Sequence, residues 1–139
     1  IFSGHVILPK KNEVKKKYNF DFNQVDNQEL STISLYINSD SHKETRKVGT
    51  TYKVKTISLN ELLKRYHAPK VIDYLSIDTE GSEFDILKEL DFDQFSFRVI
   101  TVEHNYTSKR EKIYDLLTEK GYLRKFTLFS QWDDWYFLE

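Results

Sequence analysis

Two acidic stretches in the second half of the chain contain the residue types that could carry out chemistry. The sequence DTEG at residues 78–81 follows an apolar run at 71–77, and EHN at residues 103–105 follows a second apolar run at 98–102. Carboxylates and histidine act as general bases, and carboxylate oxygens also bind Mg²⁺ or Ca²⁺. These residue types therefore predict proton transfer, a cation site, or both.

The spacing of the acids suggests how they would meet. If the backbone stays extended after residue 77, Asp78 and Glu80 point the same way, because side chains alternate along a strand. Glu103, His104 and Asn105 would join them if the two strands are neighbours, and crowding of like charges would raise one carboxyl pKa toward neutrality. The alternative is structural, because Asp, Thr, Gly and Ser are ordinary turn and helix-capping residues.

The elements that must position these residues are clear in the second half. Residues 71–77 and 98–102 are the apolar runs typical of strands that are covered on both faces, and a helix from Ser82 to about residue 90 separates them. This is the size of a βαβ unit. Ser108 and Glu111 predict the start of a second helix, Gly121 its end, and strands are expected at 122–129 and 135–138.

The first half shows weaker patterns. Residues 1–30 have no sustained period and are expected to be irregular or partly ordered. Strands are predicted at 32–38 and 51–56, and a helix follows the capping box of Ser58 and Glu61. With 139 residues, 39% hydrophobic and 31% charged, the chain predicts a single globular α/β domain over residues 1–139, with a mostly parallel sheet and a C-terminal antiparallel hairpin.

Composition excludes several classes of function. There is no cysteine, so disulfides, thiolate nucleophiles and cysteine zinc sites are excluded, and a cytoplasmic location is expected. No run approaches the ~20 apolar residues that a membrane helix needs. Residues 1–70 carry 13 Lys and Arg against 7 Asp and Glu, but the lysines lack an aromatic and arginine pattern, so a polar connector is favoured over a nucleic-acid surface. Because the chain begins at Ile1 and contains no Met, we expect it to be part of a longer protein.

The order of motifs resembles a known family. IDYLSIDTEGSEFDIL, FDFDQF, VITVEHN, REKIYDLLTEKGY and DDWYF, preceded by VKTISLNELL, are similar to the C-terminal half of the FkbM-type S-adenosylmethionine-dependent methyltransferases. The resemblance covers roughly residues 51–137. It implies a partial Rossmann-like class I methyltransferase sheet, comprising the fourth to seventh strands, and methylation of a hydroxyl on a sugar or a secondary metabolite.

The resemblance also implies roles for individual residues. Asp78, Thr79 and Gly81 would lie at the S-adenosylmethionine cofactor, and Asp78, Glu80, Glu103 and His104 are the candidate catalytic residues. Catechol-type methyltransferases hold Mg²⁺ at comparable strand ends, where Asp78, Glu103 and Asn105 are the matching positions. The family's glycine-rich cofactor loop has no counterpart here, because Gly4, Gly49, Gly81 and Gly121 are isolated.

Three alternatives remain open from the sequence. The chain could be a truncated, non-catalytic module of the same fold, used for binding or assembly. It could also be a metal-dependent glycosyltransferase or nuclease that uses Asp-x-Glu, although the nuclease pattern expects a lysine where Ser82 stands. Residues 132–136 could form an aromatic and acidic lip for a sugar, or pack as a hairpin. The expected partner is a small-molecule or glycan acceptor, with a homodimer kept as an option and neither membrane nor nucleic acid expected.

Overall fold

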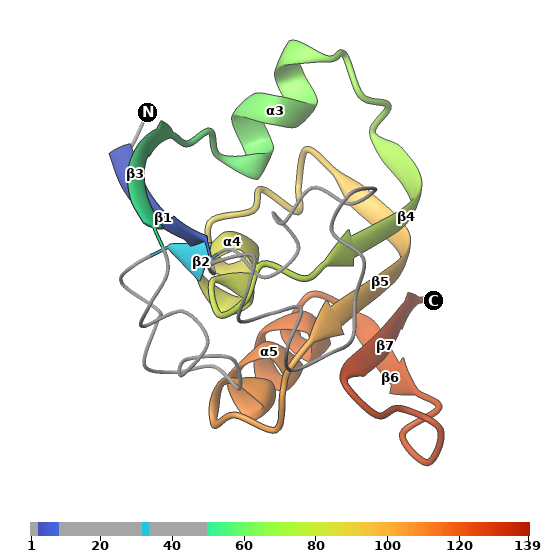
Figure 1. Cartoon of the computed structure of the whole chain (residues 1–139). Helices are drawn as coiled ribbons and strands as arrows, with labels where there is room; N and C mark the ends of the chain where they lie inside the picture. Colours follow the sequence, from blue (N-terminus) through green and yellow to red (C-terminus); the bar gives the residue numbers. More distant parts are fainter. Residues whose placement is uncertain (1–2, 9–31, 34–49) are drawn as a thin grey trace, which may run out of the picture. The chain divides into compact units, whose positions relative to one another are not determined.

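The computed structural model describes residues 3–8, 32–33 and 50–139, and the side chains from Thr56 onward. The chain divides into two compact units, with the boundary between Thr56 and Ile57. The prediction of a single domain stays a prediction. Each unit is described below by itself (Figure 1).

The first unit contains a small antiparallel sheet. Its strands are β1 (Ser3–Leu8), β2 (Thr32–Ile33) and β3 (Thr50–Lys55), in the order β2-β1-β3. Strand β3 confirms the predicted strand at 51–56, and β2 begins where the strand at 32–38 was expected, the rest of which lies outside the described residues. Residues 1–30 were expected to be irregular or partly ordered; β1 lies in this segment and pairs with β3 along its whole length, and residues 9–31 lie outside the described residues. Short strands that complete an antiparallel sheet need little hydrophobic periodicity of their own, since the ladder supplies their hydrogen bonds.

The second unit begins with α3 (Leu59–Arg65). Ser58 caps it as predicted, because its hydroxyl accepts a hydrogen bond from the Glu61 N–H at 3.1 Å. The amide of Asn60 then ties the helix to the segment after α4, since it donates to the Glu89 carbonyl and accepts from the Asp91 N–H. Leu59 and Leu63 pack against the core.

A four-stranded sheet follows, in the order β4-β5-β7-β6. Its strands are β4 (Val71–Ile77), β5 (Ser96–Glu103), β6 (Tyr122–Lys125) and β7 (Asp133–Leu138), and its helices are α4 (Glu83–Lys88) and α5 (Lys109–Glu119). Strands β4 and β5 pair in parallel with α4 between them in the chain, which confirms the predicted β-α-β unit. The second unit is therefore mixed α/β.

The expectation of a mostly parallel sheet needs correction. Only the β4–β5 pair is parallel, whereas β7 pairs antiparallel with both β5 and β6. The hairpin does form, but β7 enters the sheet between β5 and β6. Strand β6 also ends at Lys125, earlier than the predicted residue 129, because Phe126 adopts a left-handed φ of 60° that ends the extended conformation.

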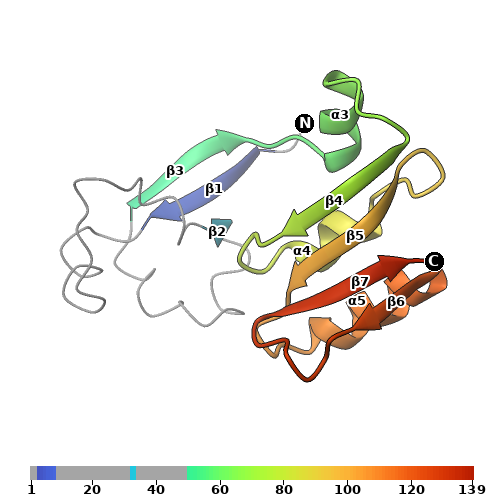
Figure 2. The same cartoon turned by 90° about the vertical axis from the view of Figure 1, so that its right-hand side faces the viewer.

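The core lies between the sheet and the two helices α4 and α5, which cover the same face of the sheet (Figure 2). Buried side chains from every strand of this sheet and both helices meet there, among them Leu87, Ile100, Leu117, Tyr122 and Tyr136. Gly121 has a φ of 87°, as predicted for the residue after a helix end. Ser108 stands at the N-terminus of α5 but makes no side-chain capping bond, so the second capping box is wrong.

Among the described residues, no helix has the length and apolar character required to cross a lipid bilayer.

Candidate active site

The carboxyl ends of β4 and β5 bring two of the predicted acids together with a third. Ile77 pairs with Val102, so Asp78 follows β4 beside Glu103, the last residue of β5. Glu103 pairs in turn with Asp133, the first residue of β7. Paired residues in a sheet present their side chains on the same face. Glu103 and Asp133 therefore share one face of the sheet, and Asp78 lies at the same edge.

The raised pKa values of two of these acids show that the acids at this edge interact electrostatically. Burial and the charges of Asp78 and Glu80, with a hydrogen bond that the protonated Glu103 donates to Asp78, raise the pKa of Glu103 to about 8. Burial and the charge of Asp78 also raise the pKa of Asp133. Because the charges are alike, ionisation of one carboxyl group makes ionisation of its neighbours less favourable. A pKa of about 8 favours the protonated form of Glu103 at neutral pH, and a nearby positive charge would favour the ionised form.

The loop that follows β4 differs from the prediction. Glu80 has a φ of 57° and Gly81 a φ of 116°, so the chain does not continue extended past Ile77. Asp78 stays exposed, whereas Glu80 is 6% exposed. The expectation that Asp78 and Glu80 point the same way is therefore wrong, because two left-handed residues turn the backbone. Glu80 nevertheless contributes its charge to the raised pKa of Glu103.

Glu83 holds this loop in place, a role that the sequence reading missed. Its Oε1 accepts three hydrogen bonds: from the N–H of Thr79 at 3.0 Å, from the Thr79 hydroxyl at 3.0 Å and from the N–H of Gly81 at 2.8 Å. Lys109 of α5 donates to the Gly81 carbonyl at 2.6 Å. The signal was present in TEGSE, where an acid at the first turn of a helix follows a glycine turn with backbone donors.

Ser82, the residue before α4, uses its hydroxyl within the same loop. The hydroxyl donates to Thr79 Oγ1 at 2.7 Å, and it makes no capping bond to the helix. The N–H groups of Thr79 and Gly81, two predicted cofactor contacts, already donate to Glu83. Asp78 is therefore the member of the predicted cofactor set that presents an exposed polar side chain.

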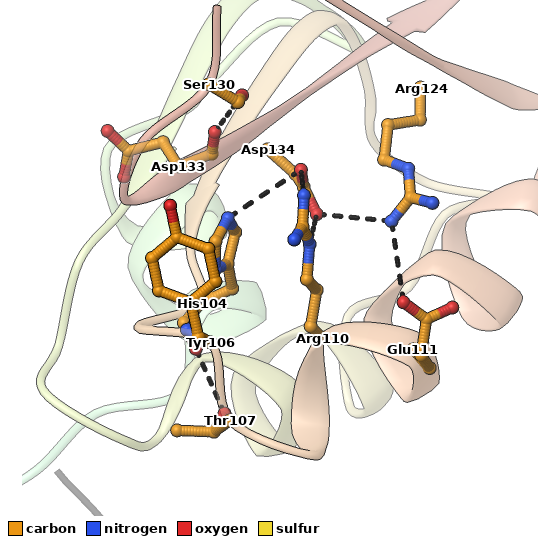
Figure 3. A network of polar contacts seen from close by, with 9 residues as sticks. All are labelled: His104, Tyr106, Thr107, Arg110, Glu111, Arg124, Ser130, Asp133 and Asp134. Atoms are coloured by element: carbon orange, nitrogen blue, oxygen red, sulfur yellow. Dashed lines mark hydrogen bonds and ion pairs between the residues drawn. The ribbon is translucent and has the colours of Figure 1, made fainter. Parts of the chain in front are cut away.

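His104 lies in a different environment from Glu103. Its side chain is 4% exposed, its Nδ1 accepts the Tyr106 N–H at 3.0 Å, and its Nε2 lies 3.8 Å from Asp134 (Figure 3). An accepting Nδ1 leaves the ring proton on Nε2. Burial and two nearby arginines lower the pKa of His104 despite the charge of Asp134. The structure thus does not bring His104 into the acid cluster.

Asp134 is the centre of this second, internal network. Arg110 donates to both of its carboxylate oxygens, at 2.8 and 2.7 Å, and Arg124 lies 3.3 Å away (Figure 3). Burial would raise the pKa of Asp134, but the hydrogen bond from Arg110 and the surrounding positive charges lower it. Tyr136 on the same strand is fully buried in the core. Asp134 and Tyr136 therefore do not belong to the exposed lip that residues 132–136 suggested.

The expected magnesium site is not supported. Asn105 sits in the turn after β5 with a φ of 42°. In the part of the chain that the structure describes, no group of three or more histidine or acidic side chains is arranged to hold a metal ion. The three acids lie at one edge of the sheet but are not gathered as a ligand set.

Comparison with known proteins identifies a family for almost the whole chain. The family model described as methyltransferase FkbM domain matches residues 5–135. The match begins well before residue 51, where the resemblance read from the motifs starts. No curated protein and no solved structure matches the chain.

Proposed function

Because the chain belongs to the methyltransferase FkbM domain family, we propose that it transfers the methyl group of S-adenosylmethionine to a hydroxyl group of a sugar or a secondary metabolite. Family membership supports methyl transfer in general. What we propose beyond this is that the acceptor atom is oxygen and that the cofactor is S-adenosylmethionine. The strand edge of Asp78, Glu103 and Asp133 supports it, since ligands of sheets with parallel strands bind at the carboxyl ends. We also propose that the second unit is the C-terminal half of a Rossmann-like class I methyltransferase sheet.

The proposal rests mainly on the position and the raised pKa of Glu103. Methylation of a neutral hydroxyl forms a carbon–oxygen bond and releases the hydroxyl proton, which a positioned base must accept. Glu103 stands at the strand edge, half-buried, with a pKa raised to about 8, which suits a base near neutral pH. His104 was the other predicted base. Its side chain belongs to the internal network of Asp134, so we assign proton acceptance to Glu103.

The charge of this edge suits the proposed cofactor. When bound, S-adenosylmethionine supplies an electrophilic methyl group on a positively charged sulfur. Asp78 is exposed beside Glu103 and would hold a cationic or hydroxyl-bearing part of the cofactor. A positive charge near Asp78 and Glu103 favours the ionised form of Glu103, because opposite charges lower a carboxyl pKa. Thr79, Gly81 and Glu83 keep the loop rigid and define the position of Asp78.

Proton release on binding tests this arrangement directly. Isothermal calorimetry of S-adenosylmethionine with the 139-residue chain at pH 7, in two buffers of different ionisation enthalpy, should report release of roughly one proton. The matched variant Glu103→Gln should bind with almost no proton release. The demethylated product, whose sulfur is neutral, should release less than the cofactor.

Transfer itself is measured with tritium-labelled S-adenosylmethionine against a panel of hydroxyl compounds. We expect kcat/KM for S-adenosylmethionine to rise with pH up to about 8, the pKa of Glu103 in the free protein. Absence of both cofactor binding and transfer would overturn the proposal and leave the non-catalytic module. Binding with unchanged turnover in Asp78→Ala or Glu103→Gln would remove these residues from the mechanism.

A further inference from the structure

Two consecutive basic residues begin α5, the helix that follows Glu103 in the chain. Lys109 is the first residue of α5 and Arg110 is the second. Positive side chains are unfavourable at a helix N-terminus, because the helix dipole already places partial positive charge there. Ser108 does not compensate with a side-chain capping bond. The contacts that these two residues make outside the helix therefore explain them better than the stability of the helix does.

The two side chains contact the elements on either side of β5. Arg110 donates to both carboxylate oxygens of Asp134 in β7, at 2.8 and 2.7 Å. Lys109 donates to the carbonyl of Gly81, in the loop after β4, at 2.6 Å. Because β5 lies between β4 and β7 in the sheet, the first turn of α5 is connected to both neighbours of the strand that ends in Glu103.

The loop that Lys109 contacts turns through two left-handed residues. Glu80 has a φ of 57° and Gly81 a φ of 116°. The N–H of Gly81 donates to Glu83 at 2.8 Å, so side chains hold both backbone groups of Gly81. Glu83 is close to Gly81 in the sequence, whereas Lys109 is 28 positions away. Glu83 therefore fixes the internal shape of the loop, and Lys109 fixes the position of the loop relative to α5.

A second contact of Lys109 connects α5 to α4. Its Nζ lies 3.9 Å from Oδ2 of Asp85, and both side chains are partly exposed. Ion pairs of this length near the surface contribute little, because water screens them. The shorter hydrogen bond from the ammonium group to the Gly81 carbonyl is charge-assisted, which makes it the stronger of the two contacts. The main contact of Lys109 is thus with the loop.

The same helix is joined to Glu103 by a short turn that hydrogen bonds close. The Thr107 N–H donates to the His104 carbonyl at 2.8 Å, and the Arg110 N–H donates to the Thr107 carbonyl at 3.1 Å. Lys109 and Glu103 are therefore the two ends of one hydrogen-bonded segment. The contact of Lys109 with the loop after β4 fixes that loop to this segment.

We propose that Lys109 is a positioning residue, which fixes the loop of Asp78 to the helix after Glu103 and so sets the distance between these two carboxylates. It thereby defines the geometry of the acid edge, which consists of Asp78, Glu103 and Asp133. As a contribution to catalysis, this role rests on the proposed methyltransferase function. As a link between two acidic segments, it stands on the hydrogen bond between Lys109 and Gly81.

The pKa of Glu103 reports the distance that Lys109 sets. Burial and the charges of Asp78 and Glu80 raise this pKa to about 8, the charge of Glu83 adds to the effect, and Asp133 pairs with Glu103 from β7. Release of the loop would move the loop acids away and admit water, and both changes lower the pKa of Glu103. Loss of a positive charge alone would raise it. The sign of the change therefore separates positioning from a charge effect.

An NMR titration of the Glu103 carboxyl group tests the proposal without the cofactor. The 139-residue chain carries ¹³C at the glutamate carboxyl groups, and the signal of Glu103 is the one that Glu103→Gln removes. Lys109→Met replaces the ammonium group with an uncharged side chain of similar length and should lower the pKa of Glu103 by about one pH unit. Lys109→Arg keeps a cationic donor and should keep the pKa near its wild-type value.

Matched variants separate the loop contact from other effects of the substitution. Lys120→Met removes the same charge at the other end of α5, and Asp85→Asn removes the ion-pair partner of Lys109 but keeps the loop contact. Both should leave the pKa of Glu103 unchanged. Circular dichroism and melting temperatures check the fold, and Lys109→Gln, with a shorter uncharged side chain, is titrated instead if Lys109→Met does not fold.

Three results would overturn the positioning role. The pKa of Glu103 could stay unchanged in the folded, uncharged Lys109 variant, which would show that the loop keeps its place without the contact. It could rise, which would show that Lys109 acts only through its charge. It could fall equally in Asp85→Asn, which would assign the effect to the ion pair between the two helices.

Methyl transfer gives an outcome that separates this role from the proposed function. In an active chain, Lys109→Met should lower kcat/KM about tenfold and move its pH profile to lower pH, and Lys109→Arg should restore most of the activity. A lowered pKa of Glu103, in a chain that neither binds S-adenosylmethionine nor transfers its methyl group, would remove the proposed function and keep the positioning role. Equal transfer and equal pH profiles in wild type and Lys109→Met would keep the function and remove the role of Lys109.

Discussion

Asp133 and Asp134 are neighbours on β7, yet they belong to two electrostatically opposite regions. Asp134 points to the helix side of the sheet, where Arg110 and Arg124 hold its pKa below the ordinary value. Asp133 points the other way (Figure 3), where burial and the charge of Asp78 raise its pKa. One residue of shift along a strand changes the face and therefore the partners.

The comparison indicates that the surrounding charges distinguish a structural acid from a reactive one: the charge of a structural acid is balanced by cationic side chains, and that of a reactive acid is not. The internal acid is ionised and fixed by two cationic side chains, so it stabilises the fold and has little tendency to accept a proton. The acids at the strand edge raise each other's cost of ionisation, and the charges that act on Glu103 are those of acidic side chains. Such a cluster gains from a bound cation or from a proton taken from a substrate.

The largest stability effect should come from neutralising the internal acid. Asp134→Asn removes the charge that two arginines share, and breaking a buried ion pair should lower the free energy of unfolding by about 3 kcal/mol. The matched change Asp133→Asn should leave stability within about 0.5 kcal/mol or raise it slightly. Urea denaturation of both variants measures the contrast. Equal losses in the two variants would show that the neighbouring acids are not in different environments.

The largest effect on activity should come from the acid edge. Glu103→Gln keeps the size of the side chain but removes the base, so kcat/KM for methyl transfer should fall about 100-fold or more. Its stability should not fall, since one of several crowded acids is neutralised. Glu119→Gln, an exposed acid at the end of α5, is the control and should keep full activity. A Glu103→Gln enzyme with wild-type kcat/KM would place the proton acceptor elsewhere.

The two regions should also give stability opposite dependences on pH. Glu103 has a pKa of about 8 in the folded chain against an ordinary 4.5, so the folded state binds more protons between these values and stability falls as pH rises from about 5 to 8. Asp134 has a lowered pKa, so its contribution is lost as pH falls below about 3.8. Urea unfolding of wild type and Glu103→Gln should show a difference that grows in favour of the variant from pH 5 to 8. His104 is present in both proteins, so its own titration cancels.

The position of Asp78 and Glu103 at the ends of neighbouring strands could be predicted from the sequence. The apolar runs before Asp78 and Glu103 were sufficient to place both acids at one edge, because parallel strands joined by a helix end on the same side. The resemblance to FkbM methyltransferases agrees with the family match. The strand β4 was predicted with its observed bounds.

The remainder depends on backbone geometry that residue types do not determine. Glu80 and Phe126 adopt left-handed conformations without being glycine, which turned the acidic loop and shortened β6. His104 was grouped with Glu103 because they are adjacent in sequence, whereas neighbouring strand residues point to opposite faces. Asp133 joined the acid edge because β7 inserts beside β5, a pairing that the order of elements does not reveal.

The smallest effect is expected at Glu83. Its carboxylate is neither paired with arginines, as Asp134 is, nor crowded by acids, as Glu103 is, but accepts hydrogen bonds from backbone and hydroxyl donors. Glu83→Gln keeps an oxygen acceptor but loses the charge that strengthens three hydrogen bonds, so the unfolding free energy should fall by only about 1 kcal/mol. The charge of Glu83 also helps to raise the pKa of Glu103, so the pH profile of kcat/KM should move to lower pH. Glu89→Gln, at the exposed end of α4, should change neither quantity. A stability loss without any movement of the pH profile would mean that the Glu83 charge, although it holds the loop, does not act on the base.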